Sequence, residues 1–252
     1  MKLEGKNILL TGGSSGIGLE ISRVLVAKGA KVMVCGRNPK RLDSAKAEIP
    51  GLLTTVCDVS DYEQIQALYH TSKERLGQID VLINNAAVFR RFLIRDFNYS
   101  LDKQLEEIDI NLNGSIRMVH AFLPDLLQRP EAVIVNLTSP SAFIPMAAAP
   151  IYSLTKAAIQ SWTQSLRLQL ADTKVRVVEL NPPAVNTQMN ADNPGVEGLK
   201  LMPPEKFARI SVRGLEKERK EIMPSHAGLV KKVRRWMPNM GFKMLNRENY
   251  VP

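Results

Sequence analysis

Tyr152 and Lys156 are the residues of this sequence whose types and spacing first suggest chemistry. They stand at i and i+4 in a stretch, residues 151–158, whose pattern predicts a helix, so one turn brings both side chains to the same face. A phenol ionises near pH ~10, but a neighbouring ammonium stabilises the phenolate and lowers its pKa. The pair is therefore a candidate proton donor with a tuning lysine, although the same spacing also arises by chance on amphipathic helices.

A glycine-rich turn near the start of the chain is the second candidate site. It follows a short apolar run, residues 7–11, which predicts a strand, and it precedes apolar residues at helical spacing. Glycines let the backbone approach a pyrophosphate, and the helix N-terminus offers free N–H groups to it. A further predicted strand at residues 31–35 favours a nucleotide site over a turn that needs glycine only for its conformation.

The end of that further strand indicates which dinucleotide binds. In NAD sites of this kind an acidic residue at this place hydrogen-bonds the adenosine ribose hydroxyls. This chain has Gly36, Arg37 and Asn38 there instead. An arginine at this place pairs with a 2′-phosphate, so we predict NADP(H) over NAD(H). The alternative for Arg37 is a solvated surface residue.

The elements that must position these residues alternate between strand and helix. Continuous apolar runs at residues 52–57, 81–87 and 132–137 predict buried strands separated by helices. That alternation indicates an α/β fold, a single Rossmann-type doubly wound parallel sheet with helices on both faces. Asp58, just past one strand, would accept a hydrogen bond from an adenine amino group or cap the helix that follows.

The composition is that of an ordinary soluble globular protein, with 252 residues, 44% of them hydrophobic and 23% charged. No apolar run approaches ~18 residues and the N-terminus has no signal-peptide core, so we expect a cytoplasmic protein. The net charge of +9 fits an anionic ligand, and equally nucleic acid or an anionic membrane. Cys35 and Cys57 have no partner at metal spacing; we expect core residues and no metal.

Several motifs in order give the sequence a resemblance to a known family. They are Thr11-Gly12-x-x-x-Gly16-x-Gly18, Asn84-Asn85-Ala86-Ala87, Asn111, Ser139, Tyr152 and Lys156. In combination they resemble the short-chain dehydrogenase/reductase family in its ordinary-length branch. Within that family, residues 180–187 together with 145–148 look most like the bacterial DltE-like oxidoreductases, a resemblance that does not settle the substrate.

The resemblance implies a role for each catalytic residue. Ser139 would hydrogen-bond a substrate oxygen, and Tyr152 would protonate it as hydride arrives from the nicotinamide. Lys156 would lower the tyrosine pKa and hold the nicotinamide ribose, while Asn111 would anchor a water that relays protons. The residues expected to bind the cofactor are Gly12, Ser14, Ser15, Gly16, Ile17, Gly18, Arg37, Asp58, Val59, Asn85, Ala86, Tyr152, Lys156, Pro182, Val185 and Thr187.

The family pattern is broken after the sixth predicted strand, where Pro182-Pro183 replaces the usual Pro-Gly. The loop touching the nicotinamide carboxamide is therefore stiffer and lacks one N–H, while Thr187 remains able to hold the carboxamide. The chain is expected to be one domain, residues 1–252. Within it we expect a cofactor and catalytic core at 1–187, a substrate lid at 188–225 and a basic tail at 226–252.

The expected substrate is a small carbonyl compound or alcohol. Its pocket wall is mostly apolar, which suggests a hydrophobic ketone or secondary alcohol, although apolar residues here equally suit a core. The residues predicted to line that wall are Phe89, Ser141, Phe143, Met146, Val185 and Met189.

The partners are less tightly defined. Family resemblance implies a homodimer or homotetramer, with dimerisation through the helices containing Asn111 and Tyr152. The basic stretch 231–237 carries interleaved apolar residues, which suit contact with an anionic membrane, or packing on the same domain or a second subunit. No nucleic-acid reader motif appears.

Two rival functions follow. One is a catalytically silent dinucleotide-sensing protein, against which Ser139, Tyr152 and Lys156 argue, and the other is a membrane-peripheral reductase of a lipid-like substrate. Enoyl reduction is disfavoured because related enoyl reductases space the tyrosine and lysine more widely.

Overall fold

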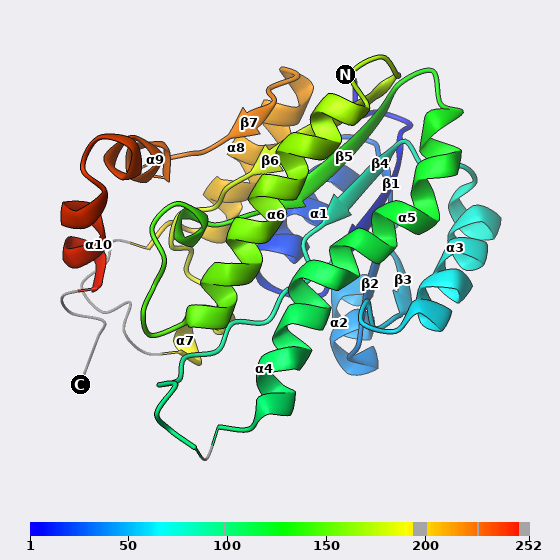
Figure 1. Ribbon diagram of the computed structural model, residues 1–252. Helices are drawn as coiled ribbons and strands as arrows, with labels where there is room; N and C mark the ends of the chain where they lie inside the picture. Colours follow the sequence, from blue (N-terminus) through cyan, green and yellow to red (C-terminus); the bar gives the residue numbers. More distant parts are fainter. Residues whose placement is uncertain (98, 194–200, 226, 247–252) are drawn as a thin grey trace.

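The fold is built on a central parallel sheet. The computed structural model describes residues 1–97, 99–193, 201–225 and 227–246, and these form seven strands in the order β3-β2-β1-β4-β5-β6-β7 (Figure 1). The strands are β1 (Asn7–Thr11), β2 (Lys31–Gly36), β3 (Leu53–Val56), β4 (Val81–Asn84), β5 (Ala132–Leu137), β6 (Val175–Leu180) and β7 (Glu221–Ile222). The prediction of a doubly wound parallel sheet is confirmed.

Helices cover both faces of the sheet. One face packs against α1 (Gly16–Ala27), α2 (Pro39–Glu48) and α8 (Pro204–Glu216). The other packs against α3 (Tyr62–Leu76), α5 (Gly114–Leu127) and α6 (Pro150–Gln169). The remaining helices are α4 (Leu101–Ile108), α7 (Gln188–Ala191), α9 (Ala227–Trp236) and α10 (Pro238–Asn246).

Alternation along the strands explains why two apolar layers form. In β1, Ile8 and Leu10 belong to the core cluster under α1, while Leu9 belongs to the cluster under α5. Successive strand side chains point to opposite faces, so a strand buried on both sides needs apolar residues throughout. Cys35 and Cys57 are buried, as expected of core residues, and they are not disulfide-bonded.

Two elements after residue 187 add to the core and to the sheet. Helix α8 packs against α1 and buries Phe207, Ala208 and Val212, so this part of the expected lid contributes to the core. The two-residue strand β7 pairs with β6, and it is too short to leave a periodic pattern in the sequence. Residues 194–200, also assigned to the lid, lie outside the described residues. No helix in the described ranges is long and apolar enough to cross a bilayer.

The strand order reverses between β1 and β4. From β1 the chain builds outward to β2 and β3, and it then returns to place β4 on the other side. At such a switch point the loops after the two strands diverge and leave a crevice at their carboxyl ends, where ligands bind in α/β sheets.

The glycine turn after β1 lies against the end of β4 with no room for side chains. Gly12 has a φ of +68°, and a Cβ there would lie 2.9 Å from the Cα of Ala86. A Cβ on Gly18 would lie 2.3 Å from the carbonyl oxygen of Gly12 and 2.6 Å from Nδ2 of Asn85. Backbone atoms cannot give way as a flexible side chain can, so these positions require glycine.

We therefore expect Gly18→Ala to destabilise the fold, with a loss of about 1–3 kcal/mol in the free energy of unfolding, because the new methyl group overlaps backbone. Gly228→Ala is the matched control: it is also helical, but its Cβ would meet nothing closer than the Met223 carbonyl oxygen at 3.9 Å. The free energy of unfolding of this control should rise by about 0.5–1 kcal/mol, because alanine favours the helix over glycine. Urea unfolding of the three proteins measures both, and equal stability of Gly18→Ala and wild type would contradict the steric argument.

Candidate active site

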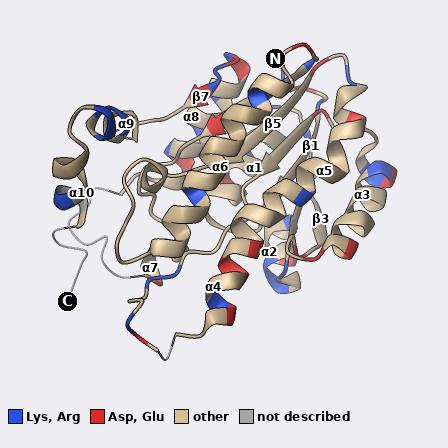
Figure 2. Ribbon diagram, in the orientation of Figure 1, with Lys and Arg blue, Asp and Glu red and all other residues tan. Residues whose placement is uncertain are grey.

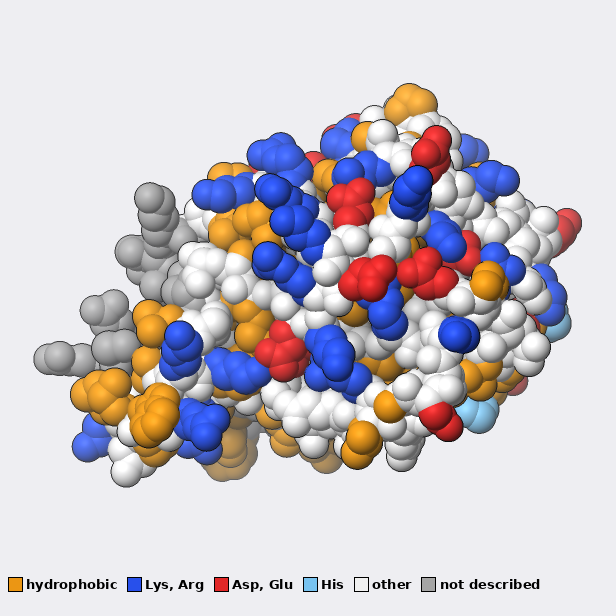
Figure 3. All heavy atoms as spheres, turned by 90° about the horizontal axis from the view of Figure 1, so that it is seen from above, with side chains coloured by type: hydrophobic (Ala, Val, Ile, Leu, Met, Phe, Trp, Pro, Cys, Tyr) orange, Lys and Arg blue, Asp and Glu red, His pale blue; other side chains and the backbone are white. Residues whose placement is uncertain are grey.

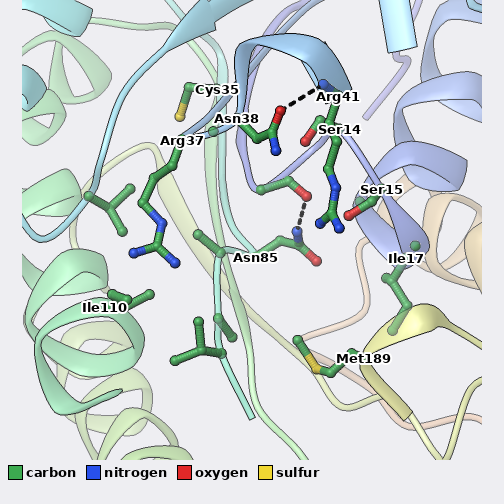
Figure 4. A pocket seen from close by; sticks show the side chains of 18 of the residues that line it. Ser14, Ser15, Ile17, Cys35, Arg37, Asn38, Arg41, Asn85, Ile110 and Met189 are labelled. Atoms are coloured by element: carbon green, nitrogen blue, oxygen red, sulfur yellow. Dashed lines mark hydrogen bonds between the residues drawn. The ribbon is translucent and has the colours of Figure 1, made fainter. Parts of the chain in front are cut away.

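A cavity of about 870 Å³ opens at the carboxyl ends of the strands, at the switch point between β1 and β4 (Figure 4). It extends from the glycine turn to the side chains of Tyr152 and Lys156. The predicted cofactor residues that line it are Gly12, Ser14, Ser15, Gly16, Ile17, Gly18, Arg37, Asp58, Val59, Asn85, Ala86, Tyr152, Lys156, Pro182 and Thr187.

The glycine-turn end of the cavity is suited to an anion. Ser15 is the N-cap of α1, and in the described structure its side chain makes no capping hydrogen bond. The first turn of α1 contains no acidic residue. The first backbone N–H groups of a helix have no intrahelical acceptor and carry the positive end of its dipole. The cavity therefore offers these N–H groups to a phosphate, and the turn glycines give it close access.

Hydrogen bonds between β1 and β4 hold this end of the cavity in shape. Asn85 Nδ2 donates to the carbonyl oxygens of Thr11 and Gly12 at 2.8 and 2.9 Å. The Thr11 hydroxyl accepts from the backbone N–H groups of Asn85 and Ala86, each at 3.0 Å. The first asparagine of the pair, Asn84, is instead buried beneath and donates to Asn136 at 2.9 Å.

Arg37 reaches into the cavity from the turn after β2, where it meets two carboxylates. Its guanidinium lies 3.2 Å from Glu106 and 3.6 Å from Asp58. Asp58 does not cap α3, which Asp61 caps by accepting from the N–H groups of Glu63 and Gln64. Asp58 is therefore oriented by Arg37 and by Ser60. Its carboxylate accepts hydrogen bonds from the backbone N–H and the hydroxyl of Ser60.

The sequence reasoning missed two further cations, Lys40 and Arg41, which also line the cavity. Asn38 caps α2 by accepting from the Arg41 N–H at 3.1 Å, and this turn directs Arg41 back toward Ser14 and Ser15 (Figure 4). The place of Lys40 and Arg41 in the first residues after β2, at the carboxyl end of the strand, was a usable signal in the sequence. Three cations therefore surround the end of the cavity next to β2.

Lys156 occupies the opposite end of the cavity and is buried. Its Nζ donates to the carbonyl oxygen of Leu137, at the end of β5, at 2.9 Å. The same Nζ lies 5.6 Å from the ring centroid of Tyr152. Burial lowers the pKa of Lys156 to about 8, against the opposing effect of Glu107, whose charge raises it.

Tyr152 is half-buried beside Ser139 and Phe89. Its ring packs edge-on against Phe89 with 4.8 Å between centroids. Burial raises the pKa of Tyr152 to about 12, the charge of Glu107 adds to this, and the Ser139 hydroxyl lowers it by hydrogen bonding. Lys156 directs its ammonium at the Leu137 carbonyl oxygen, and the lowering of the tyrosine pKa by Lys156 stays a prediction.

Asn111 lies beneath these residues, in the helix expected to carry it. After α4 the helix continues through a π-helical turn, η1 (Asp109–Asn113), into α5. Asn111 accepts from the Val88 N–H at 2.7 Å and donates to the Val88 carbonyl and to Thr155 Oγ1 at 2.8 and 3.3 Å. Its side-chain amide therefore ties the strand-end loop after β4 to α6, which carries Tyr152 and Lys156.

Comparison with known proteins identifies the family. The family model described as short chain dehydrogenase matches residues 6–196. The chain belongs to the short-chain dehydrogenase family. It is therefore an oxidoreductase by family.

Individual relatives agree with the family assignment. Uncharacterized oxidoreductase DltE of Bacillus subtilis is 37% identical over 88% of this chain and 89% of that protein. An uncharacterized oxidoreductase of Staphylococcus saprophyticus is 32% identical over 91% of this chain and 96% of that protein. The resemblance to DltE-like oxidoreductases is confirmed.

Solved structures of this short-chain dehydrogenase family share the fold. One from Burkholderia cenocepacia, in complex with NADP, has a TM-score of 0.84 at 23% identity, with 100% of both chains covered. One from Burkholderia phymatum, in complex with NAD, has a TM-score of 0.83 at 22% identity, with 100% of this chain and 99% of that chain covered.

Three predicted residues of this dehydrogenase stand away from the cavity wall. Asn111 and Ser139 do not line the cavity; Asn111 donates to Thr155, and Ser139 lies beside Tyr152, which does line it. Val185, expected at both the cofactor and the substrate, is 2% exposed and belongs to the core. Its backbone forms an isolated bridge with Met202, so it stabilises the segment around α7 instead.

Glu107 is a site residue that the sequence reasoning missed. It is fully buried on α4, one turn before Asn111, while its neighbour Glu106 pairs with Arg37 and Arg90. Within the described residues neither carboxylate oxygen has a hydrogen bond of normal geometry. Burial raises the pKa of Glu107 to about 7, although the charges of Arg90 and Lys156 and the Arg90 backbone N–H partly offset it.

The sign of this shift makes the stability of the dehydrogenase pH-dependent. The folded state holds a proton on Glu107 up to about pH 7, whereas the ordinary value is 4.5, so this residue's stabilising contribution is lost as pH rises from about 4.5 through about 7. Glu107→Gln removes this loss of stability, because glutamine does not ionise. Relative to wild type, its free energy of unfolding should rise by on the order of 2 kcal/mol between pH 5 and pH 8.

Glu74→Gln, at an exposed position of α3, is the control for this change. Its difference from wild type should stay constant across the same pH range. Denaturant unfolding at a series of pH values gives both comparisons. Parallel stability curves for Glu107→Gln and wild type between pH 5 and pH 8 would show that Glu107 does not titrate there.

Proposed function

We propose that this short-chain dehydrogenase is an NADP(H)-dependent carbonyl reductase or alcohol dehydrogenase in which Tyr152 carries the proton. The observation that carries the proposal is the single cavity that joins the phosphate-binding end of α1 to Tyr152 and Lys156. A dinucleotide with its pyrophosphate at α1 has space to extend toward the tyrosine. Such a cofactor supplies the hydride, while the chain supplies orientation and the proton.

The state of Tyr152 favours the reduction direction. With a pKa of about 12, the phenol keeps its proton at neutral pH and can donate it to a carbonyl oxygen. Ser139 reaches the same hydroxyl, and a substrate oxygen placed between the two would be hydrogen-bonded by both. Alcohol oxidation requires the phenolate, and the buried site opposes its formation.

Lys156 is placed to hold a ribose hydroxyl and to supply positive charge beneath Tyr152. Its hydrogen bond to Leu137 directs one N–H, and an ammonium has two more to donate into the cavity. Asn111 positions this pair through Thr155 and η1. We retain the water-anchoring role of Asn111 as part of the proposal.

The preference for NADP(H) rests on Arg37, Lys40 and Arg41 around one end of the cavity. Glu106 and Asp58 partly neutralise Arg37, but among the described residues no carboxylate is within ion-pairing distance of Arg41. A 2′-phosphate next to Arg41 and Ser14 would gain charge-assisted hydrogen bonds that a ribose hydroxyl lacks.

Apolar side chains at the cavity and beside Tyr152 support a hydrophobic ketone or secondary alcohol as substrate. Phe89 contacts Tyr152, Phe143 is buried in the loop before α6, and Met189 of α7 lines the cavity. We infer that α7 forms part of the lid over the substrate. The catalytically silent alternative shares the cofactor site and predicts binding without turnover.

Exposed apolar residues on α4, α5 and α6 support a homodimer or homotetramer. Leu105, Ile116 and Leu154 are 48%, 39% and 50% exposed, on the helices that carry or flank Asn111 and Tyr152. Association through these helices would bury them.

Replacement of the Tyr152 hydroxyl tests the chemistry. Tyr152→Phe should lower kcat for NADPH-dependent ketone reduction by about 10²–10⁴-fold, because the proton donor is lost, while NADPH still binds. Tyr62→Phe removes a hydroxyl from a partly exposed tyrosine on α3 and should leave kcat unchanged. Turnover, measured as NADPH oxidation with a ketone panel, that survives in Tyr152→Phe would reject the proton-donor assignment.

Cofactor choice is tested at the arginines. The Arg37→Ala/Arg41→Ala variant should raise the KM for NADPH by about 10–100-fold and change the KM for NADH much less, because only the 2′-phosphate contacts are removed. Arg209→Ala, on the exposed side of α8, is the control. Steady-state kinetics with both cofactors decide the matter, and a wild-type enzyme that uses NADH as well as NADPH would overturn the preference.

A further inference from the structure

Helices α9 and α10 form a pair that stands away from the sheet, at the left of the molecule in Figure 1. They pack on each other, and α9 contacts the 3-10 turn η2 (Pro140–Ala142) just after Ser139. The pair therefore lies beside the loop that joins Ser139 to Tyr152, rather than over the cofactor end of the cavity.

The inner side of the pair is attached to this loop by specific contacts. Asn246 accepts from the Ala147 N–H at 2.6 Å and donates to the Pro145 carbonyl at 3.0 Å. A Cβ on Gly241 would lie 2.9 Å from Cδ1 of Ile144, so the helix backbone packs tightly there. These contacts make the pair and the loop one unit.

Lys231 adds a charged contact on the same side. Its Nζ ion-pairs with Glu221 of β7 at 2.6 Å and lies 5.9 Å from the ring centroid of Phe143. Lys231 is therefore paired within the protein, whereas the other basic residues described on the two helices are exposed.

The outer side carries apolar and basic side chains together. Trp236 is 75% exposed, and the other exposed apolar residues are Leu229, Met237, Met240 and Phe242. The exposed cations are Lys232, Arg234, Arg235 and Lys243. The sequence contains no Asp or Glu between residues 227 and 246, and Figure 2 shows only basic charge on both helices.

Orange and blue side chains accordingly gather at this end of the surface in Figure 3. Tryptophan and methionine over long basic side chains suit the boundary between lipid headgroups and acyl chains, where the apolar parts enter and the charges stay at headgroup level. The outer side has the composition of an interfacial helix.

We propose that the outer side of α9 and α10 docks on an anionic membrane surface and brings the loop between Ser139 and Tyr152 up to it. The carbonyl substrate is then an amphiphile taken from the bilayer. The substrate part rests on the proposed function, whereas the docking does not. A second copy of the chain is disfavoured as the occupant, because a symmetric contact would set these cations against themselves. Anionic lipid complements them.

Co-sedimentation of the full-length protein tests the docking, with vesicles of equal parts phosphatidylglycerol and phosphatidylcholine against phosphatidylcholine alone. Partitioning should be at least about tenfold greater with the anionic vesicles, and it should fall as salt is raised. Arg234→Gln/Arg235→Gln and, separately, Trp236→Ser should each weaken it by about tenfold. Lys206→Gln/Arg209→Gln, the same charge change on α8, should leave it unchanged.

Equal partitioning into both kinds of vesicle, or an equal loss in the α8 control, would overturn the docking. So would a failure to bind either vesicle, which would leave the surface to an acidic protein. A change of oligomeric state in the Trp236→Ser protein without a change in vesicle binding would assign the surface to a second copy.

Kinetics test the substrate part. Arg234→Gln/Arg235→Gln should raise the KM for a long-chain ketone carried in anionic vesicles by about tenfold, and leave the KM for a short water-soluble ketone unchanged. An unchanged KM for both ketones would overturn the substrate part. Vesicle binding by a protein that reduces neither ketone would instead reject the proposed reductase function and leave the docking intact.

Discussion

The contact between the glycine turn after β1 and the end of β4 is the constraint on which the rest of the site depends. The Asn85 side chain lies between Gly12 and Gly18 and donates to the backbone of the turn. Because Gly12 and Gly18 have no side chains, the turn packs directly on the end of β4, and the N-terminus of α1 opens onto the crevice at the strand switch point. The position of the glycine-turn end of the cavity follows from that closeness, and the sheet then fixes how far away Tyr152 lies.

The other end of the cavity depends on ionisable side chains that are buried away from water. Lys156 and Glu107 are both buried, and each shifts toward its neutral form, while each also stabilises the charged form of the other. Tyr152 is held neutral by the same surroundings. Buried ionisable groups of this kind need a stiff scaffold, and here Asn111 provides it by tying the π-helical turn to Val88 and Thr155.

Much of this could be predicted from the sequence, because periodicity and glycine spacing act locally. The parallel sheet, the glycine-rich turn and the gathering of Arg37, Tyr152 and Lys156 around one cavity all follow from short patterns. The burial of individual side chains does not follow from such patterns, because it depends on which distant segments pack together. Glu106 and Glu107 are adjacent and identical in type, yet one is half-buried and the other fully buried, and the buried one contributes to the raised pKa of Tyr152. Val185 was predicted from the sequence to line the cavity, but it is buried in the core. Its backbone forms an isolated β-bridge with Met202, a contact that no local pattern in the sequence predicts.

Asn246 holds Pro145 and Ala147 across about a hundred positions of the chain, and it lies beyond the residues that match the family model. Two proteins with the same core can therefore share cofactor chemistry and still shape this loop differently, if their last helices diverge. Similarity measured over the core transfers the reaction type from one protein to another, but it transfers little about the molecule that reacts. In this fold, a shift of specificity during evolution can begin at a residue that never meets the substrate.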